Sequence, residues 1–581
     1  MSAIFGVVDF LGPPSVPLFS AMRDTLRHRG PDAHRQFISH RLALGQNDLV
    51  VDPSLKGQAC PPFCNERRTL WAVCDGFLYD TDPVRRSLAE QGHTCRNSHC
   101  AEIVLRAYEA WGEHFLERIK GVFALAIWDS EADMLFLARD RVGRKPLYYA
   151  RTPQGFLFAS ELQAILQAES LSRKVDVESF DYYFSLLYVP APRTMFAGVS
   201  RLPPAHFMQV REQGLHTTRY WEVLFTPQAG DSESLERMDH LFRQAVLRQT
   251  GGASSAGSLL SGGLDSSAVS SVLSSEPFYV GAATADFGAY RDEPRAADDV
   301  ARSLSIKLRT VPANSVTREC LTTLIRNSGE PYADAAVIPS AILAASVRPL
   351  SQVWLGGDGG DDIFGGHPRH LSFIRDLEVG MHAKLPSCRL LPPEEKQKLL
   401  RQTAGPELLT DVLKGHLHSS DSCDVNNLCK YEFEVRLPSQ LLTKIDTSAV
   451  FGGIEYRSPF LDEDLLAFAF SLPVSAKLGV NDDLEQKRFF KAYLRFSRLV
   501  PEEIVRRPKR GFGIPITEWL RGPLRSLCDE TLRSAEALYP AYLNQHHVIQ
   551  NLDEFQAGGG MHGYYFWKII AFELWLNLFF K

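Results

Sequence analysis

Short apolar runs separated by turns dominate the first 220 or so residues of the chain. Val122–Trp128, Met134–Ala138 and Phe156–Ala159 are three such runs, bounded by the turn residues Asp129-Ser130 and Pro153–Gly155. Apolar runs of this length between turn residues are typical of β-strands. The pattern therefore predicts a layered sheet domain in this part of the chain.

The periodicity changes near residue 230. After the polar segment Thr226–Ser234, apolar side chains at positions 235, 238, 241, 242, 245 and 246 recur at helical spacing. Further along, the short apolar runs Leu259-Leu260 and Val353–Leu355 each lead into a Gly-rich turn. Strands that lead into Gly-rich loops and then helices are typical of a parallel α/β sheet with ligands at the strand carboxyl ends. We therefore expect two domains, residues 1–225 and 226–581.

The apolar stretch Tyr564–Phe580 could be a membrane anchor or a buried helix. It is short for a bilayer span and is interrupted by Lys568, Glu573 and Asn577, so a buried helix is expected. The first residues, MSAIFGVVDF, lack the basic and apolar segments of a signal peptide. We expect no contact with a membrane.

Composition narrows the class of protein. The 581 residues include 63 Lys and Arg against 69 Asp and Glu, and the net charge of −6 without charged blocks argues against electrostatic capture of nucleic acid. Ten cysteines are sparse for this length and do not form the framework of a disulfide-rich secreted domain. These features favour a globular protein of the cytoplasm.

The segment SGGLDSS, residues 261–267, has the composition of a phosphate-binding loop. Its glycines let backbone N–H groups approach an anion, its hydroxyls add donors, and the helix-compatible run after it adds an N-terminal dipole. Asp265 fits such a loop if a divalent cation lies between its carboxylate and the phosphates. The second acidic turn, GGDGGDD at 356–362, offers Asp358, Asp361 or Asp362 as a further ligand. Each turn alone could be an ordinary surface turn, but the pair in one α/β half favours a phosphate and metal site.

These loops belong to a longer series of motifs through which the chain resembles asparagine synthetase over nearly its whole length. The motifs are RHRGPD (27–32), ARDRVGRKPLYY (138–149), YVPAPRTMFAGVSRLPPAH (188–206), SGGLDSS, GDGGDDIFGGH (357–367), LLTKID (441–446), EYRSPFLD (455–462), RRPKRGFGIP (506–515) and FELWL (572–576). Colinear matches are far more specific than a single pattern. The resemblance implies an α/β protein, with an N-terminal-nucleophile (Ntn) hydrolase-like αββα domain followed by a parallel-sheet ATP-pyrophosphatase domain.

The resemblance implies that the second domain uses ATP to convert a carboxylate to its AMP ester and releases pyrophosphate, after which a nitrogen nucleophile displaces AMP. It implies Asp265 and Asp361 as Mg²⁺ ligands and Lys509 as a catalytic lysine that faces the phosphates and the acyl-adenylate. The nucleotide or phosphate contacts that it implies are Leu259, Ser261, Gly263, Asp265, Ser266, Ser267 and Gly357. The chemistry also needs a cation and preorganised donors, because negative charge builds on phosphorus and pyrophosphate.

Asp358 is the candidate base for the attacking amine, which must lose a proton. Asparagine synthetases resemble one another in carrying glutamate at this position, whereas the related β-lactam synthetases carry tyrosine. The aspartate of this chain is one methylene shorter than glutamate. Asp358 is therefore either a base of shorter reach or a turn former.

The first domain differs from the family at the residues that the resemblance would make catalytic. In the family an N-terminal cysteine attacks glutamine and releases ammonia, whereas this chain has Ser2 and then Ala3. A serine can act as such a nucleophile. However, the family's Asn-Gly oxyanion pair is matched by Asp75-Gly76, and the aspartate for the glutamine amino group falls near Cys100. Arg41 is matched with the arginine that binds the glutamine carboxylate. We expect a domain that keeps the fold and lacks glutaminase activity.

The first domain also carries side chains that could bind zinc. They are Cys60, Cys64, Cys74, His93, Cys95, His99 and Cys100. Because no paired C-x₂-C spacing occurs, we expect buried free thiols rather than a zinc site.

Without glutamine, the nitrogen must come from free ammonia or from an amine on the substrate. β-Lactam synthetases and lasso-peptide cyclases resemble this arrangement, so we expect an ATP- and Mg²⁺-dependent amide-forming ligase of specialised biosynthesis. Its substrate would be a small molecule or peptide with a carboxylate and an amine, and the resemblance allows a homodimer. The alternatives are an asparagine synthetase that uses ammonia and a non-catalytic scaffold or regulatory protein. The presence of Asp265, Asp361 and Lys509 argues against the scaffold.

Overall fold

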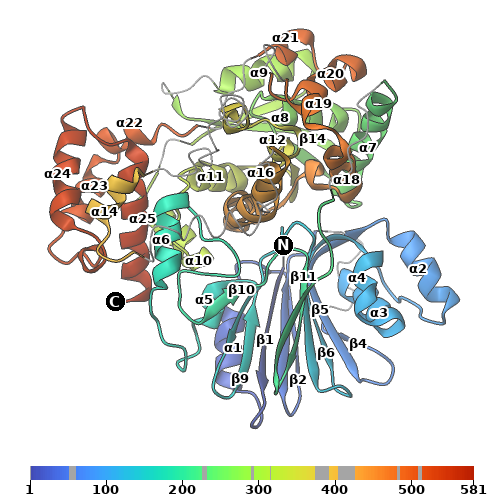
Figure 1. The fold of residues 1–581 in the computed structure, drawn as a ribbon. Coiled ribbons are helices and arrows are strands. Elements are labelled where there is room, and N and C mark those ends of the chain that lie inside the picture. Colours follow the sequence, from blue (N-terminus) through green and yellow to red (C-terminus); the bar gives the residue numbers. More distant parts are fainter. Residues whose placement is uncertain are drawn as a thin grey trace.

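Figure 1 shows the computed structural model of the protein, in which the strand-rich first half lies below the helical second half. It describes residues 2–51, 61–224, 232–288, 293–313, 316–372, 391–403, 425–479, 485–507 and 513–581. The strands of residues 3–219 form two six-stranded sheets, and those of residues 256–457 form one five-stranded sheet.

The first sheet has the order β10 (Val199–Arg201), β8 (Tyr148–Arg151), β9 (Gly155–Ala159), β1 (Ala3–Asp9), β3 (Leu42–Asp48) and β2 (Ala33–Ile38). The second has the order β12 (Gly214–Arg219), β11 (His206–Arg211), β7 (Met134–Arg139), β6 (Lys120–Asp129), β5 (Leu70–Tyr79) and β4 (Phe63–Cys64). Neighbouring strands are antiparallel in both sheets. The three runs that predict strands lie within β6, β7 and β9, so these predictions are confirmed.

Alternation along β6 explains the layered arrangement of the first domain. Ala124, Ala126 and Trp128 join the apolar layer between the two sheets. Phe123, Leu125 and Ile127 point to the other face and pack with α3 (Cys100–Trp111) and α4 (Phe115–Arg118). Since successive side chains of a strand point to opposite faces, one apolar run fills both layers. With α1 (Val16–Thr25) packed on the outer face of the first sheet, the order is helix, sheet, sheet, helix, as expected.

The second half contains the parallel sheet. Its order is β15 (Leu308–Pro312), β14 (Tyr279–Asp286), β13 (Ala256–Leu259), β16 (Val353–Leu355) and β17 (Glu455–Arg457), and all pairs are parallel. The helices α7 (Ser232–Thr250), α8 (Leu264–Leu273), α11 (Val337–Val347) and α17 (Leu442–Gly452) pack around it. Because β13 and β16 are neighbours, the two Gly-rich loops that follow them meet at one edge of the sheet.

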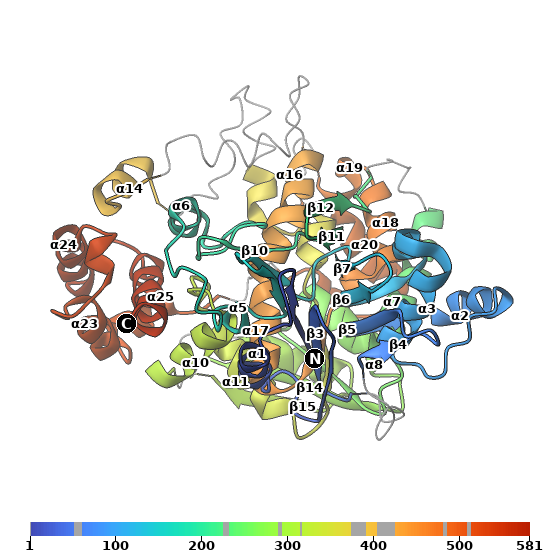
Figure 2. The same cartoon turned by 90° about the horizontal axis from the view of Figure 1, so that it is seen from below.

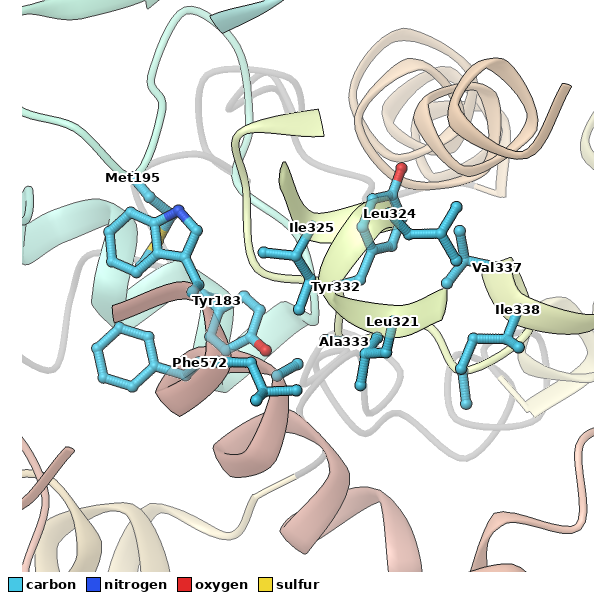
Figure 3. Packing of buried hydrophobic residues seen from close by; sticks show 14 of the residues in the cluster. Tyr183, Met195, Leu321, Leu324, Ile325, Tyr332, Ala333, Val337, Ile338 and Phe572 are labelled. Atoms are coloured by element: carbon cyan, nitrogen blue, oxygen red, sulfur yellow. The ribbon is translucent and has the colours of Figure 1, made fainter. Parts of the chain in front are cut away.

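The C-terminal apolar stretch forms α25 (Gly563–Phe579), which lies inside the protein. Figures 1 and 2 place it beside α6 (Val177–Leu186) of the first half, and the Tyr183 hydroxyl donates a 2.8 Å hydrogen bond to the Lys568 carbonyl. Figure 3 shows Tyr183 near Ile325 of α10 (Arg318–Ser328), and the rings of Tyr183 and Phe572 lie 6.3 Å apart. The expected buried helix is therefore confirmed. Within the described residues, no helix combines the length and the apolar character that a membrane crossing requires.

An ion pair joins the two halves of the chain below the parallel sheet. Arg29 of the RHRGPD motif donates from Nη1 to Oδ2 of Asp446 at 2.7 Å and from Nη2 to Oδ1 at 3.1 Å. Arg29 is 2% exposed and Asp446 belongs to the LLTKID motif, so two distant motifs meet in the interior. A two-pronged pair of this kind fixes orientation as well as distance.

Candidate active site

A cavity of about 340 Å³ opens where β13 and β16 end. The sequence-predicted residues that line it are Leu259, Ser261, Gly263, Asp265, Ser266, Gly357, Asp358 and Asp361. Residues some hundred positions apart in the chain therefore share one cavity. Lys509 lies outside the described residues, and its role stays a prediction.

Glycine is required where the two loops touch. A Cβ on Gly357 would lie 2.6 Å from both Cβ of Asp265 and the backbone nitrogen of Ser266. Gly262 has φ +78°, and a Cβ there would lie 2.5 Å from the backbone carbon of Ala296. Glycine adopts this left-handed conformation without the steric penalty of other residues. Gly357 therefore lets the two acidic loops touch, and Gly262 lets the first loop approach the helical segment that contains Ala296.

Hydroxyl and amide groups gather at the start of α8. The Ser261 and Ser266 hydroxyls lie 3.1 Å apart, and the Ser266 hydroxyl also accepts from the Ser261 backbone N–H at 3.2 Å. Helix α8 begins at Leu264, so its first N–H groups lack intrahelical partners. Exposed Ser261 and Gly263 stand in front of this helix end, which is suited to an anion.

Ser267 differs from the other predicted phosphate contacts. It is fully buried within α8, does not line the cavity, and its hydroxyl has no hydrogen-bond partner among the described residues. The helix turns by about 100° per residue, so a side chain next to Ser266 points in a different direction. The geometry does not favour Ser267 as a phosphate contact, which stays an untested prediction.

Lys487 joins the carboxylates of Asp265 and Asp361, and sequence reasoning missed it. Its Nζ donates to Oδ1 of Asp265 at 2.5 Å, also contacts Oδ2, and lies 2.7 Å from Oδ1 of Asp361. Burial by itself would lower the pKa of Lys487, but the two carboxylates outweigh burial and raise it. Asp265 and Asp361 thus lie close enough to share one cation, and carboxylate oxygens are the ligands that Mg²⁺ prefers. Nothing in the local sequence around Lys487 indicated this position.

Asp358 is paired with a second residue that the sequence did not indicate. The Tyr456 hydroxyl donates a hydrogen bond to Oδ2 of Asp358, and both side chains line the cavity. Burial and the adjacent Asp358 carboxylate raise the pKa of Tyr456 well above its usual value. A Cβ on Gly356 would lie 1.7 Å from the Tyr456 hydroxyl oxygen, so Gly356 provides the space for this contact.

The cavity lining also includes a network of charges around His367. Nε2 of His367 lies 3.2 Å from Oδ1 of Asp362 and 3.3 Å from Nη1 of Arg436. Burial lowers the pKa of His367, although the Asp362 carboxylate opposes this effect. Asp362 therefore contacts His367, whereas Asp361 and Asp265 both contact Lys487. Lys444 also lines the cavity and adds positive charge.

Asp362, His367 and Glu432 form the single group of three potential metal ligands found in the described part of the chain. Glu432 accepts a 2.6 Å hydrogen bond from Nε2 of His370 and also pairs with Arg369. Nearby cations thus already balance these carboxylates. The cysteines and histidines of the described first domain form no such group, and Cys60 lies outside the described residues.

A second cavity, of about 150 Å³, lies at Ser2 in the first domain. The Ser2 backbone N–H donates to Oδ1 of Asp75 at 2.9 Å, and the Ser2 hydroxyl donates to Oδ1 of Asp48 at 3.0 Å. Burial raises the pKa of Asp48, although His99 and hydrogen bonds from Gln46 and Ser2 oppose this effect. Ser2, Asp75 and Cys100, which the resemblance matches to the family's glutaminase positions, all line this cavity.

Two cations hold the Asp75 carboxylate in place. Nη2 of Arg29 lies 3.3 Å from Oδ2 of Asp75, and Nζ of Lys145 lies 3.5 Å from Oδ1. Lys145 also contacts Glu455 at 3.1 Å. Glu455 precedes Tyr456, which lines the 340 Å³ cavity. Asp75 is thus part of a buried charge network between the two cavities.

The expected match of Arg41 to a glutamine-binding arginine is wrong. Arg41 precedes β3 at its Leu42 end, and Leu42 pairs with Val8, whereas the Ser2 cavity lies at the other end, where Asn47 pairs with Ala3. Arg41 instead pairs with Asp133 at 2.6 Å and does not line the cavity. Strand direction separates Arg41 from the pocket, and this cannot be read from a short motif.

Comparisons with known proteins agree with both halves of this architecture. The model of the glutamine amidotransferase domain matches residues 1–221, and that of asparagine synthase matches residues 237–577. "Asparagine synthetase [glutamine-hydrolyzing] 1" of Bacillus subtilis is 26% identical over 97% of this chain and 93% of its own length. A "Putative asparagine synthetase [glutamine-hydrolyzing]" of Mycobacterium bovis is 28% identical, with 95% of this chain and 92% of its own length covered.

"Amidase chyE" of Penicillium rubens is a more distant relative, 26% identical over 86% of this chain and 85% of its own length. Among solved structures, the glutamine phosphoribosylpyrophosphate amidotransferase of B. subtilis covers 55% of this chain and 68% of its own, with 13% identity and a TM-score of 0.29, too low to bear on function. The asparagine synthase model, in contrast, matches more than half of the chain. The protein therefore belongs to the asparagine synthase family of carbon–nitrogen ligases.

Proposed function

We propose that this ligase uses ATP to adenylate a substrate carboxylate, releases pyrophosphate, and joins the acyl group to an amine that does not come from glutamine. The observation that carries the proposal is the contrast between the two cavities. The 340 Å³ cavity where β13 and β16 end, here called the synthetase cavity, brings together serine hydroxyls, paired aspartates and an acid–tyrosine pair. The first-domain cavity holds a serine against a carboxylate.

Adenylation needs donors for the phosphates and positive charge for the departing pyrophosphate. The Ser261 and Ser266 hydroxyls and the N–H groups at the start of α8 would bind phosphate oxygens. Asp265 and Asp361 would hold Mg²⁺, which when bound supplies positive charge to those oxygens. Lys487 keeps the two carboxylates together through the contacts described above. Preorganised groups of this kind stabilise charge without reorganisation during the reaction.

Amide formation needs a base for the attacking amine. We assign this role to the Asp358 carboxylate, which lines the cavity and accepts the hydrogen bond of Tyr456. The amine would transfer a proton to the free oxygen of Asp358 as its nitrogen attacks the acyl carbon and AMP departs. Tyr456 holds the carboxylate in a fixed orientation, which compensates for the short aspartate side chain.

Glutamine hydrolysis needs an oxyanion site and a reactive nucleophile. At the first-domain cavity a carboxylate, Asp75, contacts the backbone of Ser2, so an oxyanion formed there would meet negative charge instead of a donor. Arg29 and Lys145 hold this carboxylate in its position. These contacts support a first domain that keeps the amidotransferase fold without its reaction.

The charged side chains around His367 in the synthetase cavity suggest the substrate class. His367, Arg436 and Lys444 line the synthetase cavity beside several carboxylates. A lining with both positive and negative side chains suits a substrate that carries a carboxylate and an amine on one small molecule or peptide, as in specialised biosynthesis. Formation of asparagine from ammonia is the second candidate, because two relatives bear the name asparagine synthetase.

The test is ATP–pyrophosphate exchange over a panel of amino acids, amino-carboxylates and peptides. We expect exchange with a restricted set of carboxylates, and its loss in Asp265→Asn. The matched control is Asp298→Asn, which makes the same change on the half-exposed surface of α9 (Glu293–Ser303) and should leave exchange unchanged. Exchange with aspartate alone would favour the second candidate. Full exchange in Asp265→Asn would overturn the metal assignment.

A further inference from the structure

We propose that Cys100 and Cys74 form a redox-active dithiol site in the first-domain cavity, where Cys100 attacks a small disulfide and Cys74 then closes a Cys74–Cys100 bridge. The site is separate from the synthetase cavity and does not depend on the function proposed above. One of its cysteines, Cys100, lies near the position where the family carries the aspartate for the glutamine amino group, and both cysteines line the Ser2 cavity.

The two thiols approach each other from different elements. Cys74 lies on β5, and Cys100 is the first residue of α3, which packs on that strand. Sγ of Cys100 donates to the Cys74 carbonyl oxygen at 3.4 Å, which places the two cysteines next to each other. Both cysteines line the 150 Å³ cavity, although Cys100 is only 7% exposed and Cys74 only 1%. A small molecule that enters the cavity therefore lies next to both cysteines.

The surroundings of Cys100 favour its thiolate. Nδ1 of His99 lies 3.9 Å from Sγ of Cys100, and the first turn of α3 directs its N–H groups toward this end of the helix. The neighbouring Cys74 thiol, together with His99, lowers the pKa of Cys100 to about 6, although burial and the Asp48 carboxylate oppose this effect. Burial and Cys100 raise the pKa of the Cys74 thiol. The lowered pKa of Cys100 and the raised pKa of Cys74 assign the attacking role to Cys100 and the resolving role to Cys74.

The proposed reaction is a balanced thiol–disulfide exchange. The Cys100 thiolate attacks one sulfur of RS–SR, the S–S bond breaks, and RS⁻ leaves a mixed disulfide on Cys100. The Cys74 thiol then loses its proton to the departed RS⁻ and attacks Cys100, which expels the second RS⁻. The two cysteines are oxidised by two electrons, and RS–SR is reduced to two thiols. The small cavity limits the oxidant to low-molecular-weight disulfides.

The experiment treats the full-length protein with 4,4′-dithiodipyridine and follows thiopyridone release, then maps tryptic peptides by mass spectrometry. We expect a disulfide between the peptides of Cys74 and Cys100, formed faster than modification of half-buried Cys64. The rate should be constant above about pH 7 and fall tenfold per pH unit below the Cys100 pKa of about 6. Absence of the Cys74–Cys100 peptide from the wild-type digest would overturn the proposal.

Two variants separate the steps. Cys74→Ser should stop at a mixed disulfide on Cys100, so this site releases one thiopyridone instead of two. Cys100→Ser should leave Cys74 unmodified on the same timescale. Cys528→Ser is the control, because Cys528 is buried in α23 (Arg525–Leu532) and burial raises its pKa to about 12, so it should not change the reaction. Release of two equivalents from the site in Cys74→Ser would contradict the resolving role.

Discussion

The backbone N–H of Ser2 donates a 2.9 Å hydrogen bond to Oδ1 of Asp75, inside the cavity where a glutaminase would form its oxyanion. Asp75 is fully buried, and the cations Arg29 and Lys145 hold its carboxylate. Changing the nucleophile alone therefore does not restore a reactive pocket, because negative charge remains at the position that needs a hydrogen-bond donor.

The first prediction follows from this contact. Ser2→Cys supplies a thiol but leaves the Asp75 carboxylate in place, so we expect no glutamate from glutamine above the rate of a heat-inactivated sample. Enzymatic detection of glutamate checks this. Sustained glutamate formation by the variant would show that Asp75 does not block the pocket.

The second prediction concerns the ion pair between the halves of the chain. Arg29→Met leaves the buried carboxylates of Asp446, Asp75 and Glu161 without their shared cation. Loss of one partner from a buried pair costs about 3–5 kcal/mol, so the free energy of unfolding should fall by this amount in urea titrations. Arg27→Met is the control, because the Arg27 side chain is 67% exposed, and it should change stability by less than about 1 kcal/mol. Equal effects of the two variants would contradict the assignment.

The third prediction tests the contact between the two Gly-rich loops. Gly357→Ala places a Cβ 2.6 Å from Asp265 and Ser266 atoms, so the loops must separate and ATP–pyrophosphate exchange should fall at least about tenfold. Gly12→Ala is the matched control, because no atom lies within 4 Å of its new Cβ. Retention of exchange in Gly357→Ala would mean that the loops need not touch.

The fourth prediction separates adenylation from amide formation. Tyr456→Phe removes the hydroxyl that orients Asp358, so amide product should form about tenfold more slowly while ATP–pyrophosphate exchange stays near the wild-type rate. Tyr542→Phe, at a half-buried position just before α24 (Gln545–Gln556) and outside the cavity lining, serves as the control for the same chemical change. A parallel loss of both activities would place Tyr456 in adenylation instead.

The fifth prediction concerns the dependence of stability on pH. Burial raises the pKa of Glu330 from 4.5 to about 7, although Arg201 opposes this effect. The folded protein therefore favours the protonated form, so this stabilisation is complete below about pH 4.5 and is lost as the pH rises through 7. Glu330→Gln should raise the free energy of unfolding at pH 8 by about 1–3 kcal/mol and have little effect at pH 5. A gain of equal size at both pH values would contradict this assignment.

The sequence was sufficient to predict the elements and motifs that depend on local pattern. The apolar runs, such as that of β6, and the apolar composition of α25 predicted the layered domain and the buried C-terminal helix. Asp265 and Asp361 share a cavity because glycine spacing and neighbouring strands bring their loops together.

Contacts between distant segments were not predictable in this way. Lys487 reaches Asp265 from 222 residues away, and Tyr456 reaches Asp358 only because Gly356 has no side chain. The expectation for Arg41 was wrong because strand register, and not the motif, decides which end of the sheet a residue occupies. Such contacts depend on tertiary packing and leave no periodic signal in the sequence.

The most direct test of whether the nitrogen comes from an amine and not from glutamine measures amide product and glutamate in the same reaction. The wild-type protein is given ATP, Mg²⁺ and a carboxylate that supports exchange, with either glutamine or an amine as nitrogen donor. We expect amide product with the amine, and neither amide product nor glutamate with glutamine. Glutamate formed in equal amount to AMP, with amide product from glutamine, would contradict it.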